Sequence, residues 1–305
     1  MDFIQLRGVS KRFGKQRVLD NIDLNVPEGS IYGIIGLNSS GKTTLLKTMV
    51  GFYTADSGVI YYHGRKLHDF LPILKHTFGF ATQENIFYPK LTVKENLSYF
   101  GNLYGLPKQQ IAINAHNTLS LLELRDSQYK LAQHLSGGMK RRLNMACSII
   151  HNPKVLFLDE PTEDLSPVIR QDFLRLIRKI NQLGTTIILT SHVLDDVETI
   201  CDYIAIIHHG RIVQTGTFSE LLQRYGRTKE IHLTTVSRNY DPIITNLNIH
   251  DYTIKNNTLI ITTPKAEKTL QQILQLIENQ EDTIVSVDIK KSTLREIFET
   301  ITLAP

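Results

Sequence analysis

The segment from Gly36 to Thr44 has the residue types and spacing of a phosphate-binding loop. It reads Gly-Leu-Asn-Ser-Ser-Gly-Lys-Thr-Thr and fits the pattern GxxxxGK[ST]. In such a loop, backbone N–H groups surround a phosphate, and the helix that follows directs its positive N-terminal end at the same anion. Lys42 can then reach the β- and γ-phosphates, and the Thr43 hydroxyl can ligate Mg²⁺. The predicted phosphate-binding residues are Gly36, Asn38, Ser39, Ser40, Gly41, Lys42, Thr43 and Thr44.

The residues before this loop and two later segments predict a parallel sheet. An apolar run, Ile31 to Ile35, leads into the loop, and the apolar runs 155–158 and 185–189 have the same character. Continuous apolar runs are typical of parallel strands that are covered on both faces. The loop could instead be an ordinary strand-to-helix turn whose glycines only supply positive φ. The Lys-Thr pair and the strand in front favour the phosphate loop.

Two further regions add to this core. Alternating apolar residues in 3–9 and 18–26 predict antiparallel strands joined by a polar turn over 10–15. From residue 84 to about 150 the hydrophobic period becomes helical, and Thr92 is the predicted cap of one helix. We therefore expect an α/β protein with a mainly parallel core sheet, an N-terminal antiparallel β subdomain and an inserted helical subdomain.

The character of the chain changes near Gly226. We expect one domain over residues 1–224 and a small α+β domain over 225–305, which contains several short strand patterns and a helix at about 266–279. Asn256 and Asn257 are expected to form a tight hairpin turn. No motif in this smaller domain carries chemistry.

The composition is that of an ordinary globular protein. Hydrophobic residues make up 41% and charged residues 21% of the 305 residues, with a net charge of +4. The basic residues are dispersed, so no nucleic-acid arm is indicated, and we expect the local cluster Lys140-Arg141-Arg142 to be a solvated or partner-facing patch. The two cysteines suit reduced thiols. Neither a signal peptide nor an apolar stretch of about 20 residues is visible, so contact with a membrane would need a partner.

Six signals together resemble the nucleotide-binding subunits of ATP-binding cassette transporters. They follow that family's order and spacing, and their residues are the phosphate loop, Phe13, Gln83, Leu135 to Met139, Asp159-Glu160 and His192. The resemblance implies the cassette form of the P-loop NTPase fold, with ATP and Mg²⁺ as ligands. It covers about residues 1–224, and the tail near 294–300 is similar to the accessory domain of drug-resistance exporters.

The resemblance also implies a role for each motif residue. Asp159 would hold Mg²⁺ together with Thr43, and Glu160 would orient or deprotonate the attacking water. His192 would contact the γ-phosphate, although a first-turn residue after a Ser191 cap is an equally simple interpretation. Gln83 would join the Mg²⁺ and water shell. Phe13 would stack on adenine, with a core position near a turn as the alternative.

The signature Leu135-Ser136-Gly137-Gly138-Met139 is the most specific of these signals. A serine and two glycines at a helix N-terminus make a second anion site. In the resembling family this site closes on the ATP of another subunit, which implies a homodimer or pseudo-dimer with ATP between the two chains. Three residues depart from the common pattern: Ser39 replaces a glycine, Met139 a glutamine and Ser166 an aspartate.

The expected function is ATP hydrolysis that powers export of a drug, peptide or similar substrate. The resemblance implies a separate polytopic permease as partner, a peripheral position at the cytoplasmic face of the membrane, and no nucleic-acid partner. Catalysis is assigned to Lys42, Gln83, Glu160 and His192, and metal binding to Thr43, Gln83 and Asp159. Two alternatives are a soluble cassette ATPase acting on ribosomes or DNA, and a weakly hydrolysing regulatory subunit.

Overall fold

The computed structural model describes residues 2–70, 74, 76–226, 229–280, 282–290 and 293–302. Its internal contacts divide the chain into two units, Met1–Thr217 and Phe218–Pro305. The division falls after Thr217 and not after residue 224 as expected. The reason is that helix α8 (Phe218–Tyr225) packs against helix α11 (Leu294–Thr302), which belongs to the second unit.

The first unit is built on a six-stranded sheet in the order β10-β9-β3-β8-β7-β6. All neighbouring pairs are parallel except β9 with β10, which confirms the mainly parallel core. Every residue of β3, β7 and β8 is buried, as expected for strands covered on both faces. The strands span Ile31–Ile35 (β3), Phe78–Ala81 (β6), Val155–Asp159 (β7), Thr186–Ser191 (β8), Tyr203–His208 (β9) and Arg211–Gly216 (β10).

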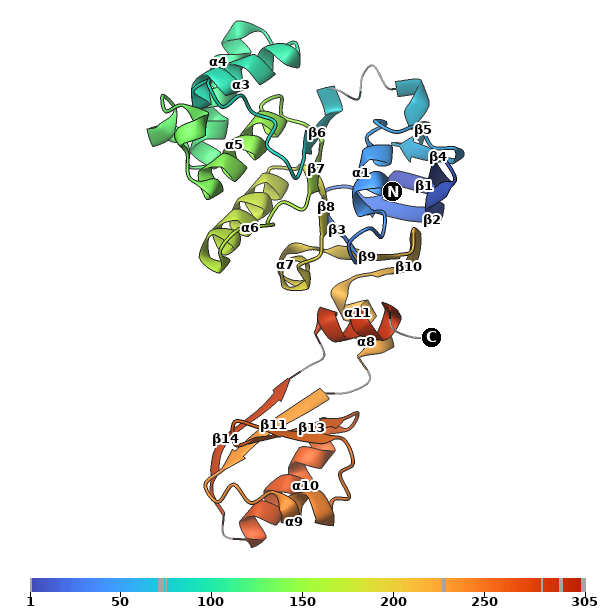
Figure 1. Ribbon diagram of the computed structural model, residues 1–305, viewed down its shortest axis with the longest axis vertical. Helices are drawn as coiled ribbons and strands as arrows, with labels where there is room; N and C mark the ends of the chain where they lie inside the picture. The colour runs from blue at the N-terminus through green and yellow to red at the C-terminus, as the bar shows by residue number, and fades with distance from the viewer. Residues whose placement is uncertain are drawn as a thin grey trace. The chain divides into compact units, whose positions relative to one another are not determined.

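Helices cover both faces of this sheet, and its parallel strands bring the motif residues to one edge. Figure 1 shows α1 on one side of the strands and α6 and α7 on the other. Four parallel strands end next to a predicted site residue: β3 before the phosphate loop, β6 before Gln83, β7 at Asp159 and β8 before His192. The carboxyl ends of parallel strands lie at the same edge of a sheet, which is where α/β folds bind ligands. These helices span Lys42–Met49 (α1), Pro167–Gln182 (α6) and Leu194–Ile200 (α7).

The N-terminal antiparallel sheet has the order β2-β1-β4-β5. Its long strands continue through most of the expected turn, so that only Gly14 and Lys15 connect them. Asp56 explains the difference, because its carboxylate accepts a hydrogen bond from the backbone N–H of Arg12 and pairs with Lys11 at 3.2 Å. The polar residues are therefore held in the strand. The strands span Asp2–Phe13 (β1), Gln16–Pro27 (β2), Ser57–Tyr62 (β4) and Arg65–Lys66 (β5), and the turn Leu67–Phe70 (η1) follows.

The inserted helical block is confirmed. It contains α3 (Val93–Leu103), α4 (Lys108–Leu121) and α5 (Gly137–Ile149), and all three pack on one another. Thr92 caps α3 in a capping box with Glu95, as the sequence predicts. Short 3-10 turns at Arg125–Ser127 (η2) and Ala132–His134 (η3) connect α4 to α5.

The second unit contains a βαββαβ module whose sheet has the order β12-β13-β11-β14. This order, with antiparallel neighbours throughout, is the ferredoxin-like arrangement. Helix α9 (Asp241–Asn246) was not predicted from the sequence. Asn256 and Asn257 both have positive φ, 48° and 63°, and they form the expected two-residue turn between β12 and β13. The other elements span Lys229–Thr235 (β11), Tyr252–Lys255 (β12), Thr258–Thr263 (β13), Ala266–Asn279 (α10) and Ile284–Lys290 (β14).

Candidate active site

The phosphate loop joins β3 to α1 in a backbone conformation that depends on its glycines. Gly41 has φ of 107°, in the left-handed region that side chains rarely adopt. A Cβ at Gly36 would lie 2.5 Å from the carbonyl oxygen of Ile207, so only glycine fits there. Ser39, the departure from the family pattern, also has positive φ, 64°. The loop therefore depends on glycine both for its local backbone conformation, at Gly41, and for its close approach to the distant strand β9, at Gly36.

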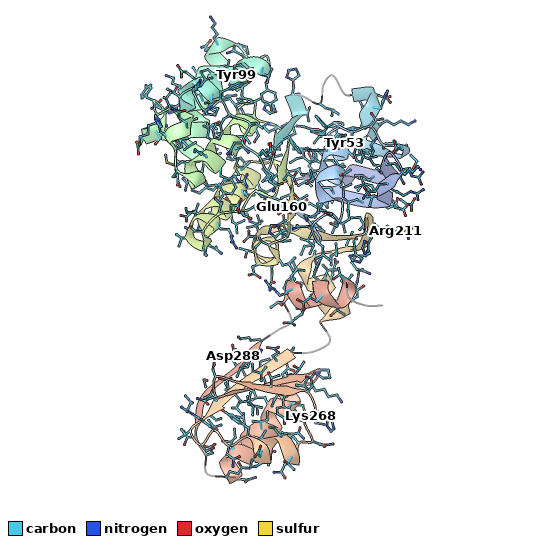
Figure 2. The ribbon with its side chains drawn as sticks, viewed as in Figure 1. Tyr53, Tyr99, Glu160, Arg211, Lys268 and Asp288 are labelled. Carbon is cyan, nitrogen blue, oxygen red and sulfur yellow. The ribbon has the colours of Figure 1, made fainter. Side chains whose placement is uncertain are left out.

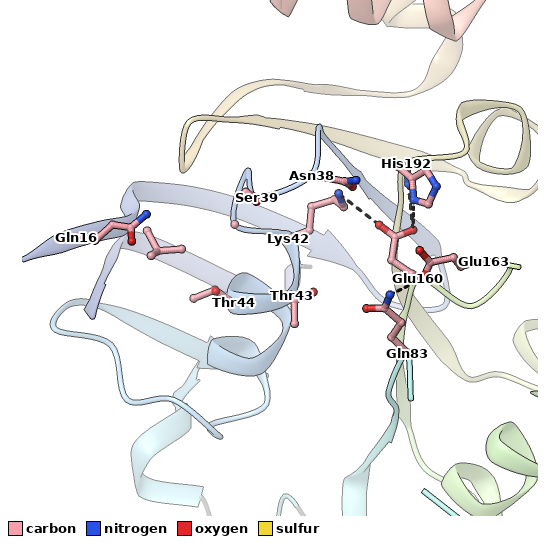
Figure 3. Close-up of a pocket in the computed structure, with 12 residues that line it drawn as sticks. Gln16, Asn38, Ser39, Lys42, Thr43, Thr44, Gln83, Glu160, Glu163 and His192 are labelled. Carbon is pink, nitrogen blue, oxygen red and sulfur yellow. Dashed lines mark hydrogen bonds and ion pairs between the residues drawn. The ribbon is translucent and has the colours of Figure 1, made fainter. Parts of the chain in front are cut away.

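Glu160 lies at the centre of a polar cluster, between Lys42 and His192. The Nζ of Lys42 donates to the carbonyl oxygens of Gly36 at 2.9 Å and Leu37 at 3.2 Å, and lies 3.3 Å from Glu160 Oε1. The other carboxylate oxygen, Oε2, lies 2.9 Å from His192 Nδ1 and accepts the backbone N–H of His192 at 3.1 Å. Figure 3 shows these side chains converging from three elements. Lys42 and Glu160 are buried, so their attraction is little screened.

Backbone strain accompanies this arrangement at Glu160. Its φ is 47°, which costs a non-glycine residue roughly 1 kcal/mol or more. The conformation is held by Thr190, whose hydroxyl accepts the N–H of Glu160 at 3.0 Å and donates to Asp159 Oδ1 at 2.7 Å. Strain of this kind is characteristic of functional sites. Figure 2 shows Glu160 among the strands at the middle of the first unit.

Asp159 and Thr43 form the oxygen pair that could hold a metal. The Thr43 hydroxyl donates to Asp159 Oδ1 at 3.0 Å, although 116 residues separate the two in sequence. Asp159 is buried, at 3% exposure. A hydroxyl and a carboxylate beside a phosphate loop suit Mg²⁺, which takes one or two protein oxygens and completes its shell with phosphate and water. The Ser40 hydroxyl is buried in the same loop without a hydrogen-bond partner. The oxygens of Thr43 and Asp159 thus fit Mg²⁺, and the hydroxyl of Ser40 fits a nucleotide phosphate.

A pocket of about 440 Å³ opens over these residues. It brings together most of the residues expected to bind nucleotide, but Phe13 is not among those that line it. The Phe13 ring packs edge-on against Tyr53 at 5.1 Å between centroids and remains 42% exposed. Three lining residues were not anticipated, because no site role was predicted for Gln16, Val18 or Glu163. The lining residues are Gln16, Val18, Asn38, Ser39, Gly41, Lys42, Thr43, Thr44, Gln83, Glu160, Glu163 and His192 (Figure 3).

The cluster Lys140-Arg141-Arg142 was expected to be a solvated or partner-facing patch, but its two arginines make contacts within the chain. The Arg141 guanidinium reaches the active-site loops, where it donates to the backbone carbonyls of Gln83, Glu160 and Glu163. Burial lowers the pKa of Arg141 from its ordinary value. Arg142 forms a salt bridge with Glu123. The expectation of a solvated side chain was wrong for Arg141, because the residue type does not show which backbone carbonyls a long side chain reaches after folding.

The signature residues lie apart from this pocket. Ser136 caps α5, its hydroxyl accepting the N–H of Met139 at 3.4 Å. A Cβ at Gly137 would meet open space, whereas one at Gly138 would lie 2.8 Å from Ile169. Among the described residues that line the pocket, none comes from 135–139. In a single chain, the anion site expected at Leu135 to Met139 is therefore a helix N-terminus that does not line the nucleotide pocket.

The third departure, Ser166, is the residue before α6. It is exposed, and its side chain makes no capping hydrogen bond. Pro167 follows at the first helical position, where its missing N–H costs nothing. Ser166 thus stands at the N-cap position of α6 without capping it through its side chain, and it has no charge where the family pattern has an aspartate.

Known proteins are similar to this chain in sequence and in fold. A family model described as ABC transporter matches residues 19–163. The linearmycin resistance ATP-binding protein LnrL of Bacillus subtilis (strain 168) is 30% identical over 98% of this chain and 98% of its own length. The daunorubicin resistance ATP-binding protein DrrA3 of Streptomyces coeruleorubidus is 28% identical over 97% of this chain and 94% of its own length.

A solved structure and a further relative give the same picture. A structure described as the ATP binding subunit of an ABC transporter has a TM-score of 0.66 and 26% identity, and the match covers 73% of this chain and 93% of that one. The bacitracin transport ATP-binding protein BcrA of Bacillus licheniformis is 31% identical over 84% of this chain and 83% of its own length. The chain therefore belongs to the ABC transporter family, among its ATP-binding subunits.

Proposed function

We propose that this ATPase subunit powers the export of a drug, peptide or similar substrate through a separate membrane protein. The observation that carries the catalytic part is the cluster of Lys42, Glu160 and His192 over one pocket. Lys42 would bind the β- and γ-phosphates and stabilise the charge that develops on the transferred phosphoryl group. Glu160 would accept a proton from the attacking water, and His192 would hold its carboxylate in place. Mg²⁺, when bound beside Thr43, Asp159 and Gln83, would supply further positive charge to the phosphates.

The signature supports a dimer as the catalytic form. Ser136 and the glycines after it lie at a helix N-terminus that is separate from the pocket of the same chain. An anion site of this kind can stabilise a nucleotide phosphate only if a second chain brings one to it. We infer a head-to-tail pair in which each ATP lies between the phosphate loop of one subunit and the signature of the other.

A groove of about 540 Å³ is the proposed docking site of the membrane partner. It lies where the end of α1 approaches β6, and its wall includes Phe52, Phe80 and Tyr104. Phe52 is 72% exposed, which is unusual for a large aromatic side chain. Thr82 also lines the groove and directly precedes Gln83, so that a segment bound there would lie next to the pocket. No described helix is long and apolar enough to cross a bilayer. The similarity to ATP-binding proteins of resistance systems supports the proposed peripheral position at the cytoplasmic face of the membrane.

The second unit and the relatives support export over the other transport functions. Two relatives named for resistance to linearmycin and daunorubicin align with nearly the whole chain, whereas the solved cassette covers 73% of it. The similarity to resistance proteins therefore extends through the second unit. Export of a toxic compound would explain a resistance name.

Mixing two inactive variants tests the dimer. Lys42→Ala removes the phosphate contact and Ser136→Arg blocks the signature, so each variant alone should lose ATPase activity by roughly 100-fold. A mixed dimer keeps one intact site, and activity should return on mixing. The membrane partner is supplied if the isolated subunit has no ATPase activity. If proven subunit exchange restores nothing, either each site is built within one chain or both sites of the dimer must be intact together, and the expectation of one independent working site is wrong.

Copurification with a polytopic membrane protein tests the partner. Ribosomes in place of the membrane protein would overturn the transport assignment.

A further inference from the structure

The signature helix α5 holds both sides of the segment that carries Gln83. Asn144 accepts the N–H of Ile86 at 2.9 Å and donates to the carbonyl oxygen of Thr82 at 3.0 Å. Arg141, one turn earlier on the same face, donates from its NH1 to the carbonyl oxygen of Gln83. Three backbone groups of one short loop are thus fixed by two side chains of α5. Asn144 is 1% exposed, so its bonds do not compete with water.

Arg141 also reaches the loop of Glu160, the proton acceptor of the proposed function. Its NH2 group lies 3.2 Å from the carbonyl oxygen of Glu160 and 3.4 Å from that of Glu163. The planar guanidinium presents its N–H groups in a fixed fork. One side chain therefore sets the distance between the Gln83 segment and the Glu160 loop. Lysine, with a single nitrogen, could not bond both loops with the same geometry.

Glu163 fixes the side chain of Gln83. Its Oε2 accepts a hydrogen bond from Gln83 Nε2, which assigns the nitrogen of the amide to that side. Figure 3 shows the consequence: the amide oxygen of Gln83 is directed away from Glu163, toward the side of Thr43. A carbonyl oxygen is the atom that a hard cation such as Mg²⁺ takes as a ligand. No motif predicted a role for Glu163, and its acidic side chain lines the same pocket.

We propose that Glu163 and Arg141 are positioning residues for Gln83 in the ATPase reaction. Glu163 orients the amide so that its oxygen faces Thr43, and Arg141 holds the backbone of Gln83 beside that of Glu160. Residues that orient a metal ligand in this way typically change metal affinity about 10- to 100-fold when they are removed. The proposal rests on the proposed function, in which Gln83 meets Mg²⁺ beside the nucleotide.

Binding of the non-hydrolysed analogue AMP-PNP tests Glu163. With Mg²⁺, Glu163→Ala should weaken binding by about 10-fold, and Glu163→Gln, which keeps an acceptor oxygen, should recover most of it. In EDTA, or in a Gln83→Ala background, Glu163→Ala should have no effect. If Glu163 acts instead as a negative charge near the phosphates, its removal strengthens binding whether or not Gln83 is present, and the proposal is overturned. Additive losses in the double variant would overturn it as well.

Arg141 is tested with Arg141→Ala, Arg141→Lys and the control Lys140→Ala on the same helix. Arg141→Ala should lower kcat by roughly 10-fold or more, leave AMP-PNP affinity without Mg²⁺ unchanged, and raise hydrogen exchange at residues 83–86 of the nucleotide-free protein. Arg141→Lys should be intermediate and keeps the test usable if the alanine variant does not fold. Wild-type kcat and wild-type exchange in Arg141→Lys would contradict the positioning role.

Failure of the inference can be told from failure of the proposed function. If wild-type protein does not bind AMP-PNP with Mg²⁺, or if Gln83→Ala leaves that binding unchanged, the proposed site itself is wrong. If wild-type protein binds and Gln83→Ala weakens binding while Glu163→Ala does not, only the positioning role of Glu163 is wrong.

Discussion

His192 contacts the carboxylate of Glu160 twice, through its ring nitrogen at 2.9 Å and through its backbone N–H at 3.1 Å, both to Oε2. The histidine after β8 therefore fixes the carboxylate after β7. The other oxygen of the same carboxylate faces Lys42. Both carboxylate oxygens are therefore engaged, one by the buried Lys42 and the other by His192, whose side chain is 40% exposed.

The first prediction separates binding from turnover at this pair. Glu160→Gln keeps the shape of the side chain but removes the proton acceptor, so that AMP-PNP should bind within about 3-fold of wild type while kcat falls by roughly 100-fold or more. His192→Ala loses only the ring contact, and its kcat should fall by about 10- to 100-fold. Equilibrium binding and steady-state ATPase assays measure both. Wild-type turnover by Glu160→Gln would remove Glu160 from catalysis.

The second prediction concerns the hydroxyl of Thr43. Thr43→Val loses the hydrogen bond to the buried Asp159 and an oxygen ligand, so the Mg²⁺ concentration needed for half-maximal ATPase activity should rise by about 10-fold. Thr48→Val on the same helix is the matched control, because that hydroxyl bonds only its own helix, at the carbonyl oxygen of Thr44. Magnesium titration distinguishes them. Equal shifts in the two variants would show a general effect of the helix.

The third prediction tests the shape of the phosphate loop. Gly36→Ala would place its methyl group 2.5 Å from the Ile207 carbonyl oxygen and from the Ser40 hydroxyl, so the loop must move. We expect AMP-PNP affinity to fall by at least about 10-fold and the free energy of unfolding by roughly 1 to 3 kcal/mol. Leu37→Ala, an exposed neighbour in the loop, should change the unfolding energy by less than about 0.5 kcal/mol.

The fourth prediction is a pH dependence of stability at His151. Burial lowers the pKa of His151 to about 4, and the ring stacks on Tyr104 while Nε2 bonds the carbonyl of Phe78. The unfolded chain binds this proton below pH 6.5, whereas the folded chain does not bind it until about pH 4. This contribution to stability is therefore complete above pH 6.5 and is lost as the pH falls toward 4, by about 2 kcal/mol at pH 5.

Unfolding by urea at pH 5 and pH 7 measures this loss. His151→Gln should flatten the difference between the two pH values by about 2 kcal/mol, because glutamine does not titrate. His68→Gln, whose ring is 85% exposed, should leave the difference as in wild type. An equal pH dependence in His151→Gln and wild type would contradict the assignment.

Much of the fold could be predicted because it is encoded locally. Apolar runs located β3, β7 and β8, the Thr92 cap located α3, and the Asn256-Asn257 pair located a hairpin. What failed depended on contacts from elsewhere. The strand β1 continues into a polar segment because Asp56 bonds that segment, and α9 is too short for its period to be seen. The division after Thr217 depends on α8 packing with α11, which lies far along the chain.

For the site, the sequence by itself determined which residues could be proposed, namely the phosphate loop and the carboxylates and histidine at the strand ends. These residues can be recognised in the sequence because each residue type is needed where it stands. A positive φ favours glycine, and phosphate and metal binding call for the Lys-Thr pair and for an acid after a buried strand. Only the tertiary structure decided which of them meet. It placed Lys42 against Glu160 and left Phe13 outside the pocket lining. Arg141 donates a hydrogen bond to a backbone carbonyl 58 residues away. Because every residue has a backbone carbonyl, the residue types in the sequence do not show which carbonyl Arg141 contacts.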